Sequence, residues 1–182
     1  MAFHTIIVGV DGRQGGRDAL ALAQRMRSVA GDLVAVRAYE RAGHDEIQDA
    51  LAAELARAGV RAELLALPGD PPARARHRAA ALTQAAMLGG GSSQRGPVGR
   101  VLAGDVALAT LHGSPCPVLI APGRYAERHV AIANVGVGFD GSPGSRAAVV
   151  LARDVAVALG AHLRVLTVLE PPAAWTAYPT WA

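Results

Sequence analysis

Apolar and polar positions follow two alternating patterns along this 182-residue chain. Short continuous runs of Val, Ile, Leu and Ala are typical of strands buried on both faces, and longer segments with an apolar residue every three or four positions are typical of amphipathic helices. The predicted strands are 5–10, 33–38, 61–67, 85–88 and 117–121. The predicted helices are 17–30, 46–58, 71–84 and 101–111. This alternation predicts an α/β fold with a doubly wound, five-stranded parallel sheet that binds ligands at the carboxyl ends of its strands.

The sequence also contains an internal repeat. Val8–Ala23 and Val137–Ala152 share Val, Gly, Asp, Gly, Gly, Arg, Ala, Leu and Ala in register, and each predicted helix ends at a glycine, Gly31 or Gly160. Similar turns would explain shared glycines, but they would not explain the shared Arg and Ala positions. A strand over 163–169 then repeats the second strand of the first copy. We therefore expect two related structural units.

The repeat predicts how the chain is divided into domains. We expect a complete domain over 1–123, a linker over 124–131 and a partial second domain over 132–182. One helix on two strands cannot bury a full core, so the partial domain is expected to pack on the first, to exchange with a partner chain or to be loosely ordered. Val118–Ala121 would remain an edge strand with apolar side chains. We therefore expect a homodimer formed through this edge.

Composition and charge exclude several classes of protein. The content of 51% apolar and 18% charged residues excludes a wholly disordered chain. All 18 basic residues are Arg, which excludes P-loop and Schiff-base lysine chemistry. The Arg residues are scattered and the net charge is only +3, so no binding to nucleic acid is expected. The absence of a leader pattern and of a long apolar run predicts a cytoplasmic protein without a membrane partner.

Residues capable of catalysis or metal binding form no recognisable constellation. The six His residues lack metal-ligand spacing, and no pair of carboxylates stands out for acid–base chemistry. The single cysteine, Cys116, lies between two prolines at the start of an apolar run, which is typical of a buried structural thiol. We therefore expect no enzyme activity, no catalytic residues and no metal site.

Candidate ligand-binding residues lie in two turns that follow predicted strands. The Gly/Ser-rich loop from Gly91 to Gly104 leads into a helix. Its glycines would let backbone N–H groups approach a phosphate chain, and a helix N-terminus favours negative charge. Asp11 ends the first strand and would lie in the same crevice. The alternatives are a plain surface loop and an Asp11 that caps the following helix or turn.

Three motifs of the chain resemble those of the universal stress protein family. They are Val-Gly-Val-Asp-Gly at 8–12 before an Ala-rich helix, the loop 91–104, and Gly-Ser-Pro-Cys-Pro-Val-Leu-Ile-Ala-Pro at 113–122. The resemblance covers the whole chain and is strongest to the tandem type, here with an incomplete second domain. It implies a five-stranded domain that is usually dimeric, with one branch of the family that binds ATP and another that does not.

The resemblance implies an ATP-binding cleft in the first domain. Asp11 corresponds to the aspartate that meets adenine, and Gly91 and Gly104 to the first and third glycines of the ribose and phosphate motif. Gln94 replaces the second glycine and brings a side chain where close backbone approach is needed. Asp105 replaces a Ser or Thr, which removes a hydroxyl donor and repels phosphates. The expected binding residues are Val10, Asp11, Ala38, Gly91, Ser92, Gly104 and Asp105.

These observations predict a non-enzymatic stress-response module that binds ATP, with Mg²⁺ entering only with the nucleotide. A bound nucleotide would order residues 89–96 and bias association, including association with an unidentified protein partner. One alternative is a module of the same fold that works by dimerisation or protein binding without nucleotide, and Gln94 and Asp105 favour it. The other alternative is a weak ATPase. The second copy carries Asp140 without a phosphate loop, so it is not expected to hold a nucleotide alone.

Overall fold

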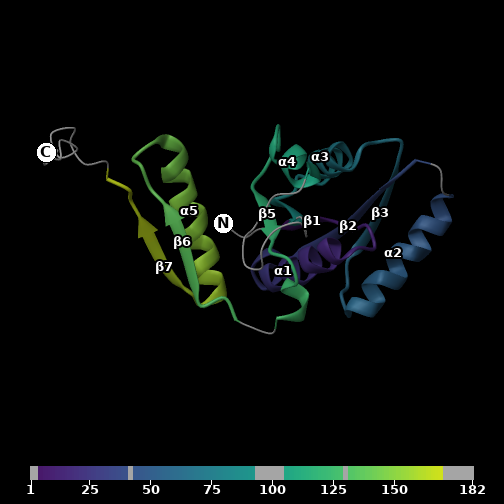
Figure 1. Ribbon diagram of the computed structural model, residues 1–182, viewed down its shortest axis with the longest axis horizontal. Helices are drawn as coiled ribbons and strands as arrows, with labels where there is room; N and C mark the ends of the chain where they lie inside the picture. Colours follow the sequence, from purple (N-terminus) through teal and green to yellow (C-terminus); the bar gives the residue numbers. More distant parts are fainter. Residues whose placement is uncertain (1–3, 41–42, 93–104, 129–130, 170–182) are drawn as a thin grey trace, which may run out of the picture. The chain divides into compact units, whose positions relative to one another are not determined.

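The computed structural model of this protein describes residues 4–40, 43–92, 105–128 and 131–169. The chain divides into two compact units, unit 1 over Met1–Val130 and unit 2 over Ala131–Ala182. In Figure 1, the colours of unit 1 run from purple to green and those of unit 2 from green to yellow. Each unit contains parallel strands joined by helices.

Unit 1 contains a five-stranded, all-parallel sheet with the strand order β3-β2-β1-β4-β5. The strands are β1 (Thr5–Gly9), β2 (Asp32–Tyr39), β3 (Glu63–Pro68), β4 (Met87–Gly91) and β5 (Val118–Ala121). The predicted α/β class and doubly wound sheet are therefore confirmed. The chain runs from β1 outward to β3 and then returns to the other side of β1 for β4 and β5. The strand order thus reverses between β1 and β4, where open sheets of this type bind ligands.

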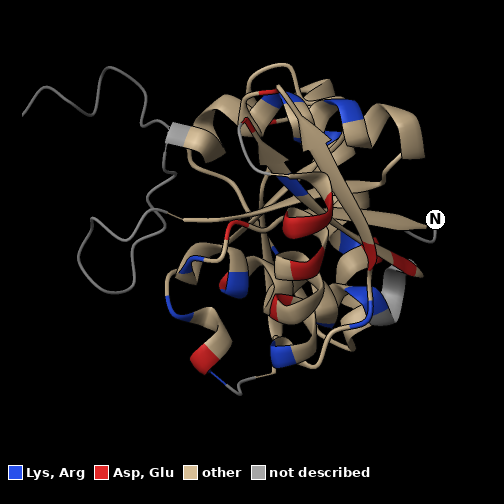
Figure 2. Cartoon of the chain, turned by 90° about the vertical axis from the view of Figure 1, so that its right-hand side faces the viewer, with Lys and Arg blue, Asp and Glu red and all other residues tan. Residues whose placement is uncertain are grey.

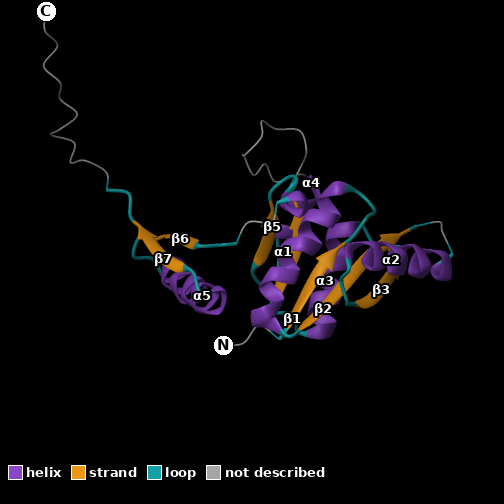
Figure 3. Ribbon diagram, turned by 90° about the horizontal axis from the view of Figure 1, so that it is seen from below, coloured by secondary structure: helices purple, strands orange, loops and turns teal. Residues whose placement is uncertain are grey.

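Helices cover both faces of this sheet. They are α1 (Gln14–Ala30), α2 (His44–Ala58), α3 (Pro72–Thr83), α4 (Asp105–Leu111) and the short 3₁₀ helix η1 (Tyr125–Glu127). Figure 1 shows α3 and α4 on one face of the sheet and α1 and α2 on the other. Figure 3 shows the alternation of helices and strands from below. Parallel neighbours need such crossovers, because a tight turn cannot connect the end of one strand to the start of the next.

The core of unit 1 combines branched side chains of the sheet with small side chains of the helices. Ile6–Val8 of β1 are fully buried, as are Leu20 of α1 and Leu51 of α2. On the opposite face, Ala75 and Ala79 of α3 are fully buried, which lets this helix approach the sheet closely. Apart from the buried Asp18 and Glu54, most charged residues lie outside this core, and Figure 2 shows basic and acidic positions interspersed.

The fourth strand extends further than its sequence predicts. The predicted strand ended at Leu88, because glycine is disfavoured in strands, but β4 continues through Gly89–Gly91. An added Cβ at Gly89 would lie 3.1 Å from Val8 Cγ2, and one at Gly91 would overlap the backbone of Gly15 at the start of α1. Close packing on β1 and α1 therefore explains the glycines of this strand, and the loop that follows starts at Ser92.

Unit 2 contains β6 (Asn134–Gly138), α5 (Pro143–Leu159) and β7 (His162–Leu166), and its two strands are parallel. Ser142 caps α5 by accepting a hydrogen bond from the Ser145 N–H at 3.1 Å. Strand β7 ends at Leu166, three residues before the predicted end, and its residues are exposed. This unit therefore repeats the local structure of β1–α1–β2 without a comparable core.

None of the helices described here combines the length and the hydropathy that a membrane crossing requires.

Candidate functional site

The carboxyl ends of β1 and β4 form the candidate site. The two strands are direct neighbours, and Val8 pairs with Gly89 near these ends. Beyond β1 the chain continues to Val10, whose N–H donates to the Val36 carbonyl of β2 at 2.9 Å. Asp11 follows at the start of the turn into α1. The site thus lies where the strand order reverses and where backbone groups of several strands end together.

Asp11 has an exposed carboxylate held by the turn that follows it. Its Oδ1 accepts a hydrogen bond from the Arg13 N–H at 3.0 Å. Gly12 has a φ of 79°, a conformation that favours glycine, and an added Cβ there would lie 3.0 Å from Arg37 Nη2. An added Cβ at Gly16 would lie 3.1 Å from Asp11 Oδ1. The two glycines therefore let the chain turn sharply, which leaves the carboxylate at the sheet edge.

Arg76 of α3 brings a guanidinium group to the same strand ends. An added Cβ at Gly9 would overlap this guanidinium, and one at Gly90 would lie 3.2 Å from Arg76 Nη1. The group therefore packs directly on the backbones of β1 and β4. Its Nη1 donates to Oγ1 of Thr110 in α4 at 3.3 Å. Among the described residues, the other N–H groups of this guanidinium have no hydrogen-bond partner.

The surroundings of Arg76 determine its charge. Burial lowers the pKa of the Arg76 guanidinium, and the neighbouring Asp11 carboxylate raises that pKa and opposes the effect of burial. Because the pKa of an arginine starts so high, the group still carries its positive charge at neutral pH. A half-buried cation with unused N–H donors, near an exposed carboxylate, can bind a ligand that has both a negative group and a hydrogen-bond donor.

Thr110 and His77 fix α3 and α4 around the guanidinium. Thr110 is buried, and its hydroxyl donates to the Val106 carbonyl at 2.7 Å. His77 Nε2 donates to the Thr110 carbonyl at 2.8 Å. The two helices on this face are therefore joined by polar contacts next to Arg76, which limits the positions that its side chain can adopt.

Several of the predicted site residues lie at this edge of the sheet. Val10 is buried behind Asp11, and Ala38 lies half-buried near the end of β2. Gly91 ends β4, and Ser92 follows it with a buried Oγ that has no hydrogen-bond partner in the described part of the chain. Gly91 was predicted to be glycine for close approach to a phosphate. Its contact with the backbone of Gly15 is a second constraint, because it leaves no space for a side chain.

Three predicted positions fall wholly or partly outside the described residues. Gly104 and Gln94 lie outside them, and Asp105 is described only as the first residue of α4, without its side chain. The contribution of the loop 93–104 therefore stays a prediction. Cys116 packs against the core, and burial raises the pKa of its thiol, against the opposing effect of a hydrogen bond with Ser114, as expected for a structural cysteine.

Sequence reasoning missed Arg76. The helix was predicted, but none of its arginines was assigned to a site. A signal was present, because Arg76 is three and four residues before Ala79 and Ala80, which lie on the buried stripe of α3. A charged residue on the apolar stripe of a helix that packs on a sheet indicates a group with a special role.

Comparisons with known proteins show two kinds of similarity. Residues 2–122 match the sequence profile of the Universal stress protein family. A universal stress protein solved in complex with cAMP is 24% identical, with a TM-score of 0.54 over 68% of this chain and 99% of that one. A universal stress protein from Archaeoglobus fulgidus DSM 4304 is 18% identical, with a TM-score of 0.70 over 93% of this chain and 69% of that one.

A third similar structure is longer than this chain. It comes from Pseudomonas aeruginosa UCBPP-PA14, was assigned to the same group of proteins and is 20% identical, with a TM-score of 0.70. The match covers 96% of this chain but 65% of the Pseudomonas chain. At these identities the solved structures support the fold, and the sequence profile supports the family.

Proposed function

Because this chain belongs to the universal stress protein family, we propose that unit 1 is a non-enzymatic stress-response module that binds an adenine nucleotide, with ATP as the expected ligand. The observation that carries this proposal is the position of the Arg76 guanidinium on the carboxyl ends of β1 and β4, close enough to the Asp11 carboxylate for the two charges to influence each other. A structurally similar family member was solved in complex with cAMP, which is also an adenine nucleotide. The fold alone would not support the proposal, because one fold can serve many functions.

The donors and acceptors at this edge fit such a ligand. The exposed Asp11 carboxylate can accept a hydrogen bond from the amino group of adenine. Val10 and Ala38 would supply backbone and wall contacts beside it. The Arg76 guanidinium can donate to a phosphate. Mg²⁺ would enter only with the nucleotide, as a counterion of its phosphates.

A second candidate function is a module that associates with proteins and binds no nucleotide. Gln94 and Asp105 favour it, because both depart from the phosphate-binding pattern. So does the edge strand β5, which pairs with β4 on one side and carries Val118 and Ile120 partly exposed. We propose a homodimer through this edge, as edge strands with apolar side chains tend to pair. A monomeric mass in light scattering at micromolar concentration would contradict this assembly.

We also propose that the protein is of the tandem type, with unit 2 as an incomplete second domain. The repeat of Val-Gly-x-Asp-Gly and the parallel β6–α5–β7 arrangement support this. Two longer structures also support it, because their matches cover 93% and 96% of this chain and therefore include unit 2.

The proposal is tested by calorimetric titration of the full chain with ATP and with cAMP, with and without Mg²⁺. The variant Arg76→Gln removes the half-buried positive charge, and we expect it to weaken nucleotide binding about 10- to 100-fold. Arg78→Gln is the matched control, because Arg78 lies on the same helix but is exposed and pairs with Asp70 at 2.9 Å. Equal affinities of the two variants, or no binding by the unmodified protein, would contradict the proposal. Phosphate release no faster than in a heat-denatured sample is the expected result for a non-enzymatic module.

A further inference from the structure

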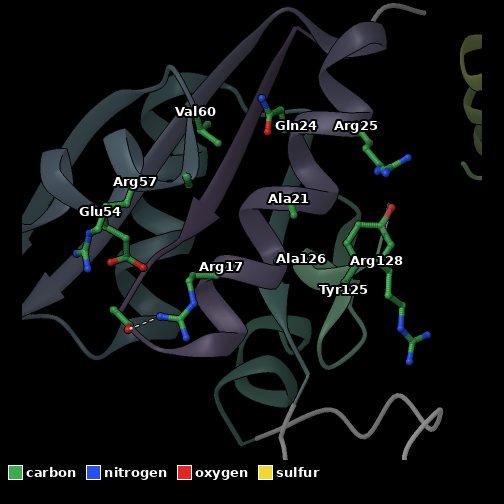
Figure 4. Close-up of a pocket in the computed structure, with 12 residues that line it drawn as sticks. Arg17, Ala21, Gln24, Arg25, Glu54, Arg57, Val60, Tyr125, Ala126 and Arg128 are labelled. Atoms are coloured by element: carbon green, nitrogen blue, oxygen red, sulfur yellow. Dashed lines mark hydrogen bonds between the residues drawn. The ribbon is translucent and has the colours of Figure 1, made fainter. Parts of the chain in front are cut away.

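Unit 1 contains a second concave site, on the face of the sheet covered by α1 and α2. It is a cavity of about 590 Å³ lined by residues of α1, of the end of α2 and of η1 (Figure 4). Binding sites for small molecules have volumes of about 300–1,000 Å³, so this cavity is large enough for one. Arg76 does not line it. The cavity is therefore distinct from the group of residues assigned to nucleotide binding.

A buried carboxylate fixes one wall of this cavity. Asp18 of α1 is 1% exposed. Its two oxygens accept hydrogen bonds from the Arg124 N–H at 2.8 Å and the Ala126 N–H at 2.9 Å, and its Oδ1 also accepts one from Gln14 Nε2 at 3.0 Å. These bonds join α1 to η1, which is more than 100 residues later in the chain. The wall formed by Tyr125 and Ala126 is therefore built on rigid contacts.

Glu54 supplies a buried acceptor in the cavity. Its side chain lies at the end of α2 and is 5% exposed, and its Oε1 has no hydrogen-bond partner among the described residues. A buried carboxylate oxygen without a partner is costly, and near the carboxyl end of a helix the helix dipole disfavours the negative charge further. Its position is therefore not explained by the stability of α2. A ligand that donates a hydrogen bond to Oε1 would explain it.

Guanidinium groups line this cavity, and Figure 4 shows those of Arg17 and Arg57 near Glu54 and those of Arg25 and Arg128 near Tyr125. Four arginines line the cavity, namely Arg17, Arg25, Arg57 and Arg128. Arg17 donates to the Gly12 carbonyl at 3.2 Å and to Gln14 Oε1 at 2.7 Å, and Arg57 donates to the Ala53 carbonyl at 3.2 Å. The acceptors of these two arginines are uncharged. Their positive charges therefore face the cavity without a described acidic partner and can attract an anion.

The remaining lining offers no uncovered aromatic ring on which a flat aromatic ligand could stack. Ala21, Ala58 and Val60 present small apolar surfaces between the charged groups. The aromatic ring in the cavity, that of Tyr125, is already covered by the Arg25 guanidinium at 5.9 Å from its centre, and Figure 4 shows these two side chains next to each other. A nucleotide base would lack a free surface for stacking. The cavity instead combines donors for an anion with an acceptor for hydroxyl groups.

We propose that this cavity binds a small phosphorylated polyol, such as a sugar phosphate. The phosphate is held by Arg17 and Arg57, and a hydroxyl group of the ligand donates to Glu54 Oε1. The ligand needs both the phosphate and the hydroxyl group. A bare anion would leave Oε1 without a donor and would be repelled by the Glu54 carboxylate. This site does not depend on the nucleotide proposal.

Calorimetric titration of the full chain with glucose 6-phosphate, inorganic phosphate and glucose tests this site. We expect glucose 6-phosphate to bind about tenfold more tightly, or better, than either of the other two. Glu54→Gln and Arg57→Gln are each expected to weaken the binding of glucose 6-phosphate about tenfold. The controls are Glu46→Gln, an exposed glutamate on the same helix, and Arg78→Gln, an exposed arginine outside the cavity, and neither should change the affinity. No binding of glucose 6-phosphate, equal binding of inorganic phosphate, or an unchanged affinity of Glu54→Gln would overturn the proposal.

A second measurement keeps the test decisive if a variant fails to fold. In NMR titrations of the unmodified protein, glucose 6-phosphate should shift the amide signals of Gly12, Ala21, Ala58 and Ala126, which line the cavity. Shifts confined to Gly9 and Gly90, next to Arg76, would place the ligand in the other site and overturn the proposal.

Discussion

The two copies of the Val-Gly-x-Asp-Gly repeat form nearly the same turn. Oδ1 of Asp11 and Oδ1 of Asp140 each accept a hydrogen bond from the N–H two residues later, at 3.0 Å and 2.9 Å. Gly12 and Gly141 have φ values of 79° and 82°. The repeated arginine of each helix also donates to the carbonyl of its glycine. The local sequence thus determines the turn in both units.

The surroundings of the two turns differ. β1 lies between β2 and β4 with a fully buried centre, whereas β6 pairs with β7 and is mostly exposed. Asp11 has Arg76 beside it, and no residue described in unit 2 takes that place beside Asp140. The aspartate turn alone therefore does not bring a guanidinium group to the carboxylate. The proposed site needs the neighbouring strand β4 and the helix α3 as well.

Among changes at equivalent positions of the two units, Asp18→Ala is expected to have the largest effect on the free energy of unfolding. Asp18→Ala would leave the buried N–H groups of Arg124 and Ala126 without an acceptor, which costs about 2–5 kcal/mol in the free energy of unfolding. The equivalent residue of the repeat is already an alanine, the exposed Ala147 of α5. The reciprocal change Ala147→Asp should therefore alter stability by less than about 1 kcal/mol, which is the range of helix propensity at an exposed position.

Native-state amide exchange of Ile6–Val8 measures the effect of Asp18→Ala, because these residues form the fully buried centre of β1. An Asp18→Ala protein as stable as the original would contradict the role of this carboxylate.

Gly9 and its repeat partner Gly138 give the next largest contrast. A Cβ at Gly9 would overlap the Arg76 guanidinium, whereas one at Gly138 would meet no atom within 4 Å. Gly9→Ala should therefore destabilise unit 1 by about 1–3 kcal/mol. Gly138→Ala should change stability by less than about 1 kcal/mol. Urea denaturation followed by amide signals of each unit separates the two effects.

The cause of the Gly9 effect can be isolated. In the double variant Gly9→Ala, Arg76→Ala, the guanidinium is absent and the added methyl group should be tolerated. If the added methyl group lowers the stability of unit 1 as much without Arg76 as with it, the inferred packing of Arg76 on β1 is wrong.

The smallest expected effect concerns the acidity of Asp140. Hydrogen bonds from Ser142, with a smaller contribution from Ser145, lower the pKa of Asp140 from 3.8 to about 2. Because the pKa is lower in the folded state, this carboxylate stabilises unit 2 fully above pH 3.8, and the contribution is lost as the pH falls towards 2. Ser142→Ala should raise the pKa towards its ordinary value, as measured by NMR titration of the carboxyl carbon. A pKa that stays near 2 in this variant would show that the Ser142 hydroxyl is not the main cause, since the backbone N–H of residue 142 is still present.

Elements determined by local sequence could be predicted well. The branched run of β1 and the Asp-Gly turn specify their own conformation, and the strand and helix that follow were predicted within three residues. The end of β4 was predicted less well, since Gly89–Gly91 have low strand propensity and are held by contacts with β1 and α1. Packing between elements distant in sequence overrides local preference there.

The residues that build the two sites were harder to predict for the same reason. Asp18 binds backbone groups more than 100 residues away, and Arg76 reaches strands that are adjacent only in the folded sheet. Glu54 lies three residues after Leu51 and next to Leu55 on the buried stripe of α2, so its position was a signal that the sequence analysis did not use. In each case the residue type and its face of the helix could be read from the sequence, but the distant groups that lie around it in the folded chain could not.

The central claim is that Asp11 and its surroundings form a nucleotide-binding site that the repeated turn of Asp140 does not form. Calorimetric titration with ATP of Asp11→Asn and Asp140→Asn tests it most directly, because the two changes are chemically identical and the two turns have nearly the same geometry. We predict that Asp11→Asn weakens binding about tenfold or more, while Asp140→Asn leaves it unchanged. Equal affinities of the two variants would contradict the account.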